Sequence, residues 1–248
     1  ALGFGALSAN TTASNNTAVG GQALTLNTTG TFNTAVGRSA LTANTTADNN
    51  TAVGYNSLLS NTTGFSNTAI GKDALAATTT GNTNTAVGVD ALTTNTVGDK
   101  STALGYEALK TQNPASNVDM LNTAVGFNAG LAVTTGVQNT FIGGLAGDAN
   151  TTADNNVAVG YASLSSNTTG ASNTAVGKSS LKSNTTASQN TAVGLESLED
   201  NTTGSDNTAI GHQSLTSNTE GLKNTALGGA AMQTNTTGDF NTAVGREA

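Results

Sequence analysis

The feature that most constrains this chain is a 17-residue repeat that runs through the whole sequence. The pentapeptide Asn-Thr-Ala-Val-Gly, or a close variant of it, occurs once in each repeat. Successive glycines of this motif are 17 residues apart everywhere except between Gly105 and Gly126, where the interval is 21. The repeat glycines are Gly3, Gly20, Gly37, Gly54, Gly71, Gly88, Gly105, Gly126, Gly143, Gly160, Gly177, Gly194, Gly211, Gly228 and Gly245.

The length of the repeat selects the fold class. Helical solenoids need about 33–47 residues per repeat, and Val-Gly and Asn-Thr-Thr-Gly are poor helix sequences. The sequence therefore predicts an all-β fold, a parallel β-solenoid of the β-roll or β-helix kind, in which each 17-residue repeat forms one coil. We expect a single domain over residues 1–248, with about 14 coils stacked about 4.8 Å apart into a rod on the order of 70 Å long.

Two aliphatic columns are predicted to form ladders inside the solenoid. One column directly precedes the repeat glycine, and the other follows the glycine by four residues. The first includes Val19, Val36, Val53 and Ile70, and the second includes Leu24, Leu41 and Leu58. Columns of Ala and Ser beside them would let the two walls approach closely, and the glycine would give the backbone freedom at a corner.

Two asparagine columns are predicted to mark the corners. Asn16 and Asn33 belong to one, and Asn27 and Asn44 to the other. Asparagine tolerates left-handed turns and hydrogen-bonds to nearby backbone, and stacked side-chain amides can also hydrogen-bond to one another. Threonine between the corners has a strong strand propensity. The unusual composition is therefore explained by architecture.

The repeat is interrupted once. The four extra residues fall within residues 111–121, which include the only proline, Pro114, and the pattern stays weak as far as residue 147. There, Gly130 and Gly147 replace the usual leucine, and Phe141 replaces an alanine. Insertions in solenoids form loops on one face. We expect an extruded loop at about residues 111–121, as either a tolerated insertion or a functional loop.

Composition excludes several classes of function. The chain has no cysteine and one histidine, His212, so disulfides, thiolate nucleophiles and two-histidine metal sites are excluded. A net charge of −7 with only eight Lys and Arg argues against nucleic-acid binding, and no apolar run could span a membrane. The acidic residues occupy variable positions, His212 is expected at the solvated surface, and the calcium-binding β-roll motif is missing. We expect no enzyme, no cofactor and no metal site.

The segment Asn-Thr-Ala-Val-Gly-x-x-Ala-Leu, as in residues 16–24, resembles the head repeat of trimeric autotransporter adhesins of the YadA type, and it is similar to tail-fibre-like repeats. The resemblance covers nearly the whole chain. It implies a left-handed β-roll, three chains per rod, and a fibre at a cell surface that binds host matrix or other surfaces. The family period is shorter, and the family's neck, stalk and membrane anchor have no counterpart here.

Asn-x-Thr sequons are a second property of the asparagine columns. Candidate N-glycosylation sites are Asn10, Asn27, Asn44, Asn61, Asn167, Asn184, Asn201 and Asn235. If they were modified, glycans would decorate one edge of the rod. The simpler interpretation is a structural corner ladder that happens to fit the sequon.

Two surface features leave other functions open. Regular threonine ranks on a β-solenoid favour ice binding, but the dependable pairs here are adjacent, as in Thr28-Thr29, whereas threonines with one residue between them would share a strand face. A ladder at Val19 would also turn Thr17 inward. Aromatic residues at variable positions would anchor a partner if exposed, although scattered exposed aromatics need no explanation. These residues are Phe4, Phe32, Tyr55, Phe65, Tyr106, Phe127, Tyr161 and Phe240.

The sequence thus predicts a non-enzymatic structural or adhesive rod of an extracellular or cell-surface fibre. Binding would be multivalent and spread over repeated outward residues, with a surface, matrix or glycan ligand and self-association as a homotrimer. Ice binding is the first alternative. The second is a subunit that stacks end to end into a filament, because both ends stop inside a coil without a polar cap. The chain begins at Ala1 without a secretory leader, so we expect it to be processed or cut from a longer protein.

Overall fold

The computed structural model describes residues 1–248, and its regular secondary structure consists of three-residue β-strands. The chain divides into two compact units, Ala1–Asn122 and Thr123–Ala248. The first unit contains β1 (Thr17–Val19), β2 (Thr34–Val36), β3 (Thr51–Val53), β4 (Thr68–Ile70), β5 (Thr85–Val87) and β6 (Thr102–Leu104). The second contains β7 (Thr123–Val125), β8 (Thr140–Ile142), β9 (Val157–Val159), β10 (Thr174–Val176), β11 (Thr191–Val193), β12 (Thr208–Ile210), β13 (Thr225–Leu227) and β14 (Thr242–Val244).

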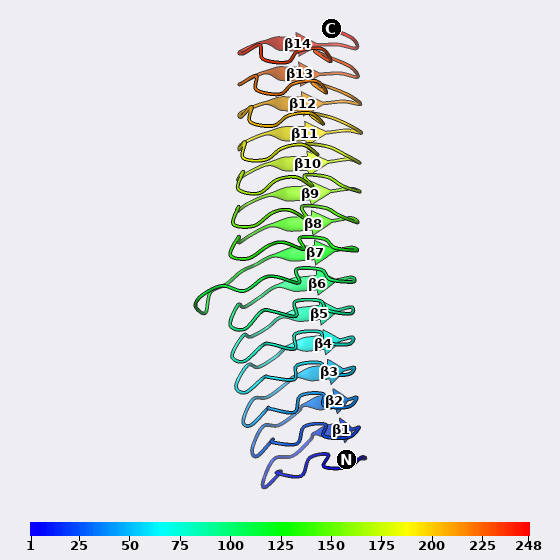
Figure 1. Cartoon of the computed structure of the whole chain (residues 1–248), viewed down its shortest axis with the longest axis vertical. Helices are drawn as coiled ribbons and strands as arrows, with labels where there is room; N and C mark the ends of the chain where they lie inside the picture. The colour runs from blue at the N-terminus through cyan, green and yellow to red at the C-terminus, as the bar shows by residue number, and fades with distance from the viewer. The chain divides into compact units, whose positions relative to one another are not determined.

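Within each unit, every strand pairs in parallel with the next strand along the chain (Figure 1). The register places equivalent residues of successive repeats opposite each other: Thr17 opposite Thr34 in the first unit, and Thr174 opposite Thr191 in the second. The predicted all-β parallel β-solenoid with a 17-residue coil is therefore confirmed in both units. The expectation of a single domain over residues 1–248 stays a prediction.

Hydrogen bonds between coils continue well beyond the short strands. The Leu24 N–H donates to the Ala40 carbonyl oxygen at 3.0 Å. At the next corner, the Thr28 N–H donates to the Thr45 carbonyl oxygen at 2.9 Å. Each coil therefore satisfies much of its backbone on its neighbours, which explains how strands of only three residues hold a stable stack.

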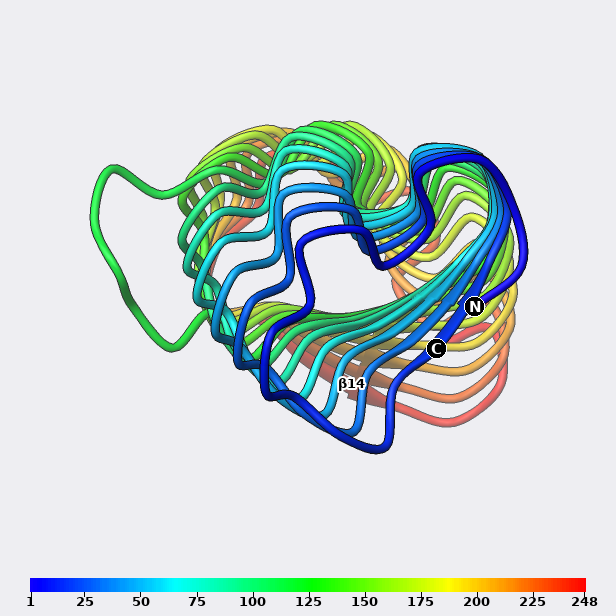
Figure 2. The same ribbon diagram turned by 90° about the horizontal axis from the view of Figure 1, so that it is seen from below.

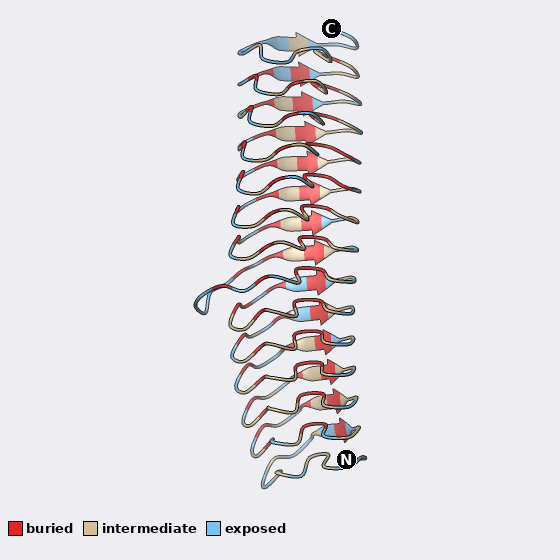
Figure 3. Ribbon diagram, viewed as in Figure 1, coloured by how far each residue is buried: buried red, intermediate tan, exposed pale blue.

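The core is lined by alanine where we expected valine. The middle residue of each strand from β1 to β13 is buried, as Ala18 and Ala35 are, with exposed fractions of 1% and 0%. Its two neighbours face outward, because successive side chains of a strand point to opposite sides. The predicted inward ladder of Val19, Val36, Val53 and Ile70 is therefore wrong: Val19 is 38% exposed and Ile70 39%, and Val36 and Val53 are half-buried. Figure 3 shows this alternation as a buried centre in most strands.

The leucine column is the main apolar component of the core, as predicted. Leu24, Leu41 and Leu58 are fully buried. They sit in the left-handed backbone region, with φ of 53° at Leu24 and 49° at Leu58, which costs about 1–2 kcal/mol for a residue with a Cβ. Full burial of a leucine side chain contributes about 1.5–3 kcal/mol, so burial offsets the strain. Small residues that follow the glycine by three positions, such as Ala23, are also buried in most coils.

The repeat glycines make the corner at the end of each strand. Gly20 has a φ of +131°, and a Cβ there would collide with the carbonyl group of Gly37 in the next coil. The position therefore needs glycine twice, for its backbone conformation and for the close approach of the neighbouring coil. This confirms the corner role predicted for the column.

The four extra residues form the expected loop, which projects from the first unit beyond the outline of its coils (Figure 2). Asn113 and residues 115–119 are exposed, whereas Pro114 and Met120 are buried and fix the two arms of the loop. Gln112 occupies the ladder position of Asn27. Its Oε1 atom accepts a hydrogen bond from Asn122 Nδ2 at 2.9 Å.

Candidate functional site

The two asparagine columns lie inside the coils and hydrogen-bond in different ways. In the column of Asn27, the amide of Asn44 donates to Asn27 Oδ1 at 2.8 Å and to the Ala47 carbonyl oxygen at 3.0 Å. In the column of Asn16, the Oδ1 atom accepts the backbone N–H of Asn33 at 2.8 Å. The predicted Asn ladders are therefore present.

At each corner, one backbone carbonyl oxygen accepts hydrogen bonds from an asparagine of each column. The Gly30 carbonyl oxygen accepts Asn16 Nδ2 at 2.7 Å and Asn27 Nδ2 at 2.9 Å. The same arrangement recurs at Ala47, where Asn33 and Asn44 donate. The two amides fix the path of the chain between the columns.

Burial of the asparagine side chains makes most of the candidate glycosylation sites inaccessible. The interior sequon asparagines are fully buried, and their Nδ2 atoms already donate to protein oxygens, as Asn44 Nδ2 does. A glycan on Nδ2 would displace these hydrogen bonds and open the stack. The sequon interpretation is wrong for the folded chain at Asn27, Asn44, Asn61, Asn167, Asn184 and Asn201. Asn10 and Asn235, at the ends of their units, are half-buried.

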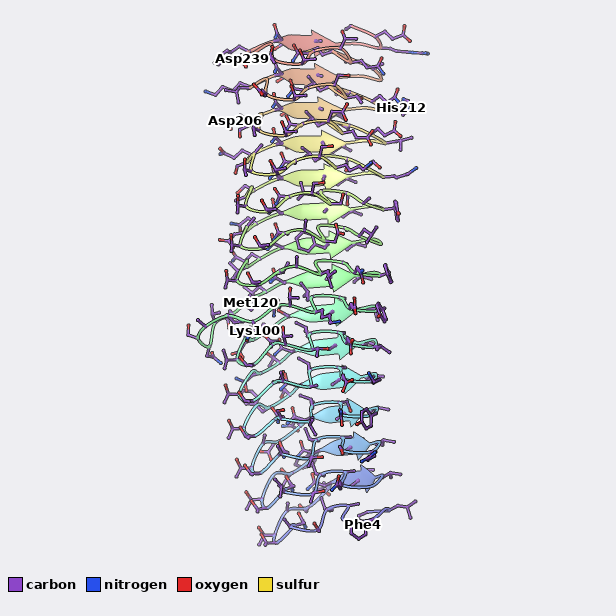
Figure 4. All side chains as sticks on the ribbon, in the orientation of Figure 1. Phe4, Lys100, Met120, Asp206, His212 and Asp239 are labelled. Carbon is purple, nitrogen blue, oxygen red and sulfur yellow. The ribbon has the colours of Figure 1, made fainter.

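The side chains available for chemistry are dispersed. The structure contains no pocket and no group of three or more His, Cys, Asp or Glu residues that could hold a metal ion. It contains no helix long and apolar enough to cross a membrane. His212 and Asp206 are exposed and point away from the coils (Figure 4). Asp239 is also exposed, but its Oδ1 atom accepts the Leu222 N–H of the preceding coil at 2.7 Å.

Ionisable residues have shifted pKa values in four places, each with a structural cause. Side-chain hydrogen bonds to Asp73 and Asp119 raise the pKa values of Lys72 and Lys100. Lys110 Nζ lies 2.6 Å from Glu107 Oε1 and 3.4 Å from Asp90 Oδ2. The hydrogen bond from Lys110 lowers the pKa of Glu107, and the hydrogen bond to Glu107 raises the pKa of Lys110. Burial raises the pKa of the Asp148 carboxyl group, whose Oδ1 atom is buried without a hydrogen-bond partner. Glu107 and Lys110 belong to the first unit, and Asp148 belongs to the second.

The repeated surface is the outward face of the strands, which we name the strand face. It consists of the first and third residues of each strand, such as Thr17 and Val19 in β1 or Thr191 and Val193 in β11. The expectation that Thr17 faces inward is wrong, because Thr17 and Val19 are both exposed. Sequence reasoning missed this face because it assigned the larger side chain to the core. The alternation Thr-Ala-Val itself carried the signal.

The adjacent threonine pairs lie at a corner outside the strands. Thr28 Oγ1 donates to the Thr45 carbonyl oxygen at 3.1 Å, and Thr45 Oγ1 donates onward to the Thr62 carbonyl oxygen at 3.3 Å. The first threonine of such a pair is thus half-buried and structural. The second, such as Thr29 or Thr46, is exposed.

Exposed apolar side chains concentrate in the aliphatic row of the strand face and at the position just past the glycine corner. Of the twenty-two large apolar residues that are exposed, fifteen lie directly before the repeat glycine or directly after it. The position after the glycine includes the exposed aromatics Tyr55, Tyr106, Phe127 and Tyr161. Arg38 in the preceding coil lies over the Tyr55 ring, 5.9 Å from its centroid. Since apolar exposure recurs at this position rather than scattering, the edge formed by the residues directly after the repeat glycines is the second candidate contact surface.

Comparison with known proteins gives no assignment. No family model matches the sequence, and no curated protein is similar to it.

Proposed function

We propose that this chain is a non-enzymatic structural and adhesive rod of an extracellular or cell-surface fibre. The observation that carries the proposal is that each coil presents the same outward residue types at the same positions. A surface of this kind suits many weak, identical contacts, whose combined strength can exceed that of any one contact by orders of magnitude. The absence of a pocket is compatible with contact of this sort.

The resemblance to the head repeats of trimeric autotransporter adhesins supports the same proposal. In this proposal, the chain associates with copies of itself as a homotrimer and adopts the left-handed coil of those heads. The exposed apolar edge past the glycine corner is compatible with such association, because exposed apolar side chains gathered in one place mark interaction surfaces. The ligand would be a matrix protein, a glycan or another surface.

Light scattering tests the proposed assembly. It should give a solution mass near three times the 24.3 kDa of one chain, whereas a monomer would contradict the trimer. Large polydisperse masses would instead favour the end-to-end filament.

The adhesive function is tested on arrays of immobilised matrix proteins and glycans. A variant lacking residues 174–207, which are two whole repeats, keeps the register of the second unit. We expect the full chain to bind, and the shortened chain to bind with a faster overall dissociation rate because it makes fewer contacts. Equal dissociation rates would indicate one localised site. Failure to bind any surface would overturn the adhesive function.

A further inference from the structure

We propose that the strand face also binds the surface of ice, a function beyond the adhesive one. Each three-residue strand offers two outward side chains, a threonine and an aliphatic residue in nearly every case. Of the twenty-eight outward positions, twenty-six hold Thr, Val or Ile, the other two hold Leu, and none holds a charged residue. The face therefore combines hydroxyl and methyl groups and lacks the ionic groups that bind disordered water strongly.

The strand face repeats in two directions. Along each strand, its two outward side chains are two residues apart, about 6.6 Å. Across strands, equivalent residues are in register, as Thr174, Thr191 and Thr208 are, and follow one another about 4.8 Å apart. Each unit thus carries a regular two-dimensional array. A crystal surface is a partner that repeats in two directions at comparable spacings.

The array is rigid before any ligand binds. β-branched side chains have restricted χ1 rotation, and coil-to-coil hydrogen bonds fix the backbone beneath them, with Thr174 N–H donating to the Asn190 carbonyl oxygen at 2.8 Å. A rigid face loses little conformational entropy when it binds. Water molecules held between the Thr and Val rows would therefore be ordered by the protein alone.

The composition of the face argues for ice over a protein partner. Protein interfaces are enriched in aromatic and Arg anchors, and the strand face has none. The aromatic side chains lie outside it, past the glycine corner, as Tyr55 does after Gly54. The mixture of hydroxyl and methyl groups without long side chains suits a regular lattice of water.

The experiment uses the full chain and places a bulky side chain on the strand face of each unit. The test variant is Thr51→Tyr with Thr191→Tyr, both in strands. The control variant is Thr46→Tyr with Thr186→Tyr, which alters exposed corner threonines of the same two units. Circular dichroism melts establish that both variants fold. Ice-growth arrest (thermal hysteresis) and inhibition of ice recrystallisation are then measured against protein concentration.

We expect the unmodified chain and the corner variant to arrest ice growth alike, and the strand-face variant to need at least about tenfold more protein. Thr191→Val and Thr191→Ser then separate the methyl from the hydroxyl contribution. Absence of activity in the unmodified chain, or equal activity of the two tyrosine variants, would overturn the proposal. A third result would also overturn the proposal: no ice activity, together with an unmodified chain that is oligomeric and a strand-face variant that is monomeric. The strand face would then be an interface between copies of the chain.

Discussion

The side-chain Oδ1 atom of Asn61 is buried without a hydrogen-bond partner because Thr78 stands where the ladder requires the next asparagine. Elsewhere in the column, Oδ1 accepts Nδ2 of the following coil, as Asn44 Oδ1 accepts from Asn61 at 3.0 Å. Thr78 has no amide, and its hydroxyl donates to the Asn95 carbonyl oxygen at 2.8 Å instead. A single substitution therefore breaks the ladder and leaves one orphaned acceptor.

Replacing Thr78 by asparagine should repair the ladder. The new Nδ2 would reach Asn61 Oδ1, and the new Oδ1 would be available to Asn95 Nδ2. Each restored hydrogen bond contributes about 1 kcal/mol, which raises the melting temperature by about 2–4 °C per kcal/mol in a domain of this size. The measurement is a thermal melt by circular dichroism, with Thr80→Asn, at an exposed position, as the control. A melting temperature of Thr78→Asn at or below that of the unmodified chain would contradict the prediction that the restored ladder stabilises the fold.

Replacing Asn44 by aspartate should destabilise the chain strongly at neutral pH. The carboxylate would lose both donated hydrogen bonds and face Asn27 Oδ1 and the Ala47 carbonyl oxygen. Leaving a buried charge uncompensated costs about 3–5 kcal/mol. Because burial would raise the folded-state pKa of the introduced carboxyl group above its unfolded value of about 3.9, stability would fall as pH rises from about 4.

Urea unfolding of Asn44→Asp at pH 7 and near pH 3 measures this effect. The control is Asn15→Asp, at an exposed position, which should change stability little at either pH. Equal loss of stability at both pH values would show that the cost is steric rather than electrostatic.

Phe141 and Gly147 are expected to be coupled energetically. The Phe141 ring is fully buried and fills the space that leucine occupies in other coils, and a Cβ at Gly147 would collide with it. Phe141→Ala should cost about 3–5 kcal/mol because it leaves a cavity. Gly147→Leu alone should also destabilise, through overpacking.

The double variant Phe141→Ala with Gly147→Leu restores the usual residues of both columns and should recover most of the loss. A double-mutant cycle on urea midpoints measures the coupling. If the losses of stability in the two single variants simply add in the double variant, the two side chains do not fill the same space and the prediction is wrong. The left-handed φ of 57° at Gly147 would cost a leucine about 1–2 kcal/mol, a cost that the other coils already bear, as at Leu58 with a φ of 49°.

Asp148 is expected to make stability depend on pH. Burial raises its pKa in the folded state, so the folded chain holds its proton more tightly than the unfolded chain. Stability should therefore fall as pH rises from about 4, the unfolded pKa, through the raised folded value. Asp148→Asn should melt at a higher temperature than the unmodified chain at pH 7, and the two should converge near pH 3. Asp200→Asn, at an exposed position, controls for the change in net charge.

Most of the fold could be predicted because the same residue types recur at the same position in many coils, which makes each structural assignment clearer than any one residue would. A single Leu24 is a weak signal, but a leucine at the same place in most coils indicates a buried column. The candidate surface was harder to predict. Val19 and Ala18 are neighbours in a strand, and a shift of one residue exchanges the two faces. Hydrophobicity alone favoured the larger side chain for the interior.

The sequence by itself determined the period, the parallel in-register stack, the leucine column, the glycine corners and the asparagine ladders, because each depends only on equivalent positions meeting every 17 residues. Tertiary structure alone decided which strand residue faces inward. The buried leucines fill the interior from elsewhere in the coil, so the strand contributes Ala18 and turns Thr17 and Val19 to solvent. The tertiary structure also decided that the sequon asparagines are buried and that Phe141 fills the space beside Gly147. These outcomes depend on how side chains from separate positions of a coil together fill its interior, and the repeat pattern does not show which positions meet there.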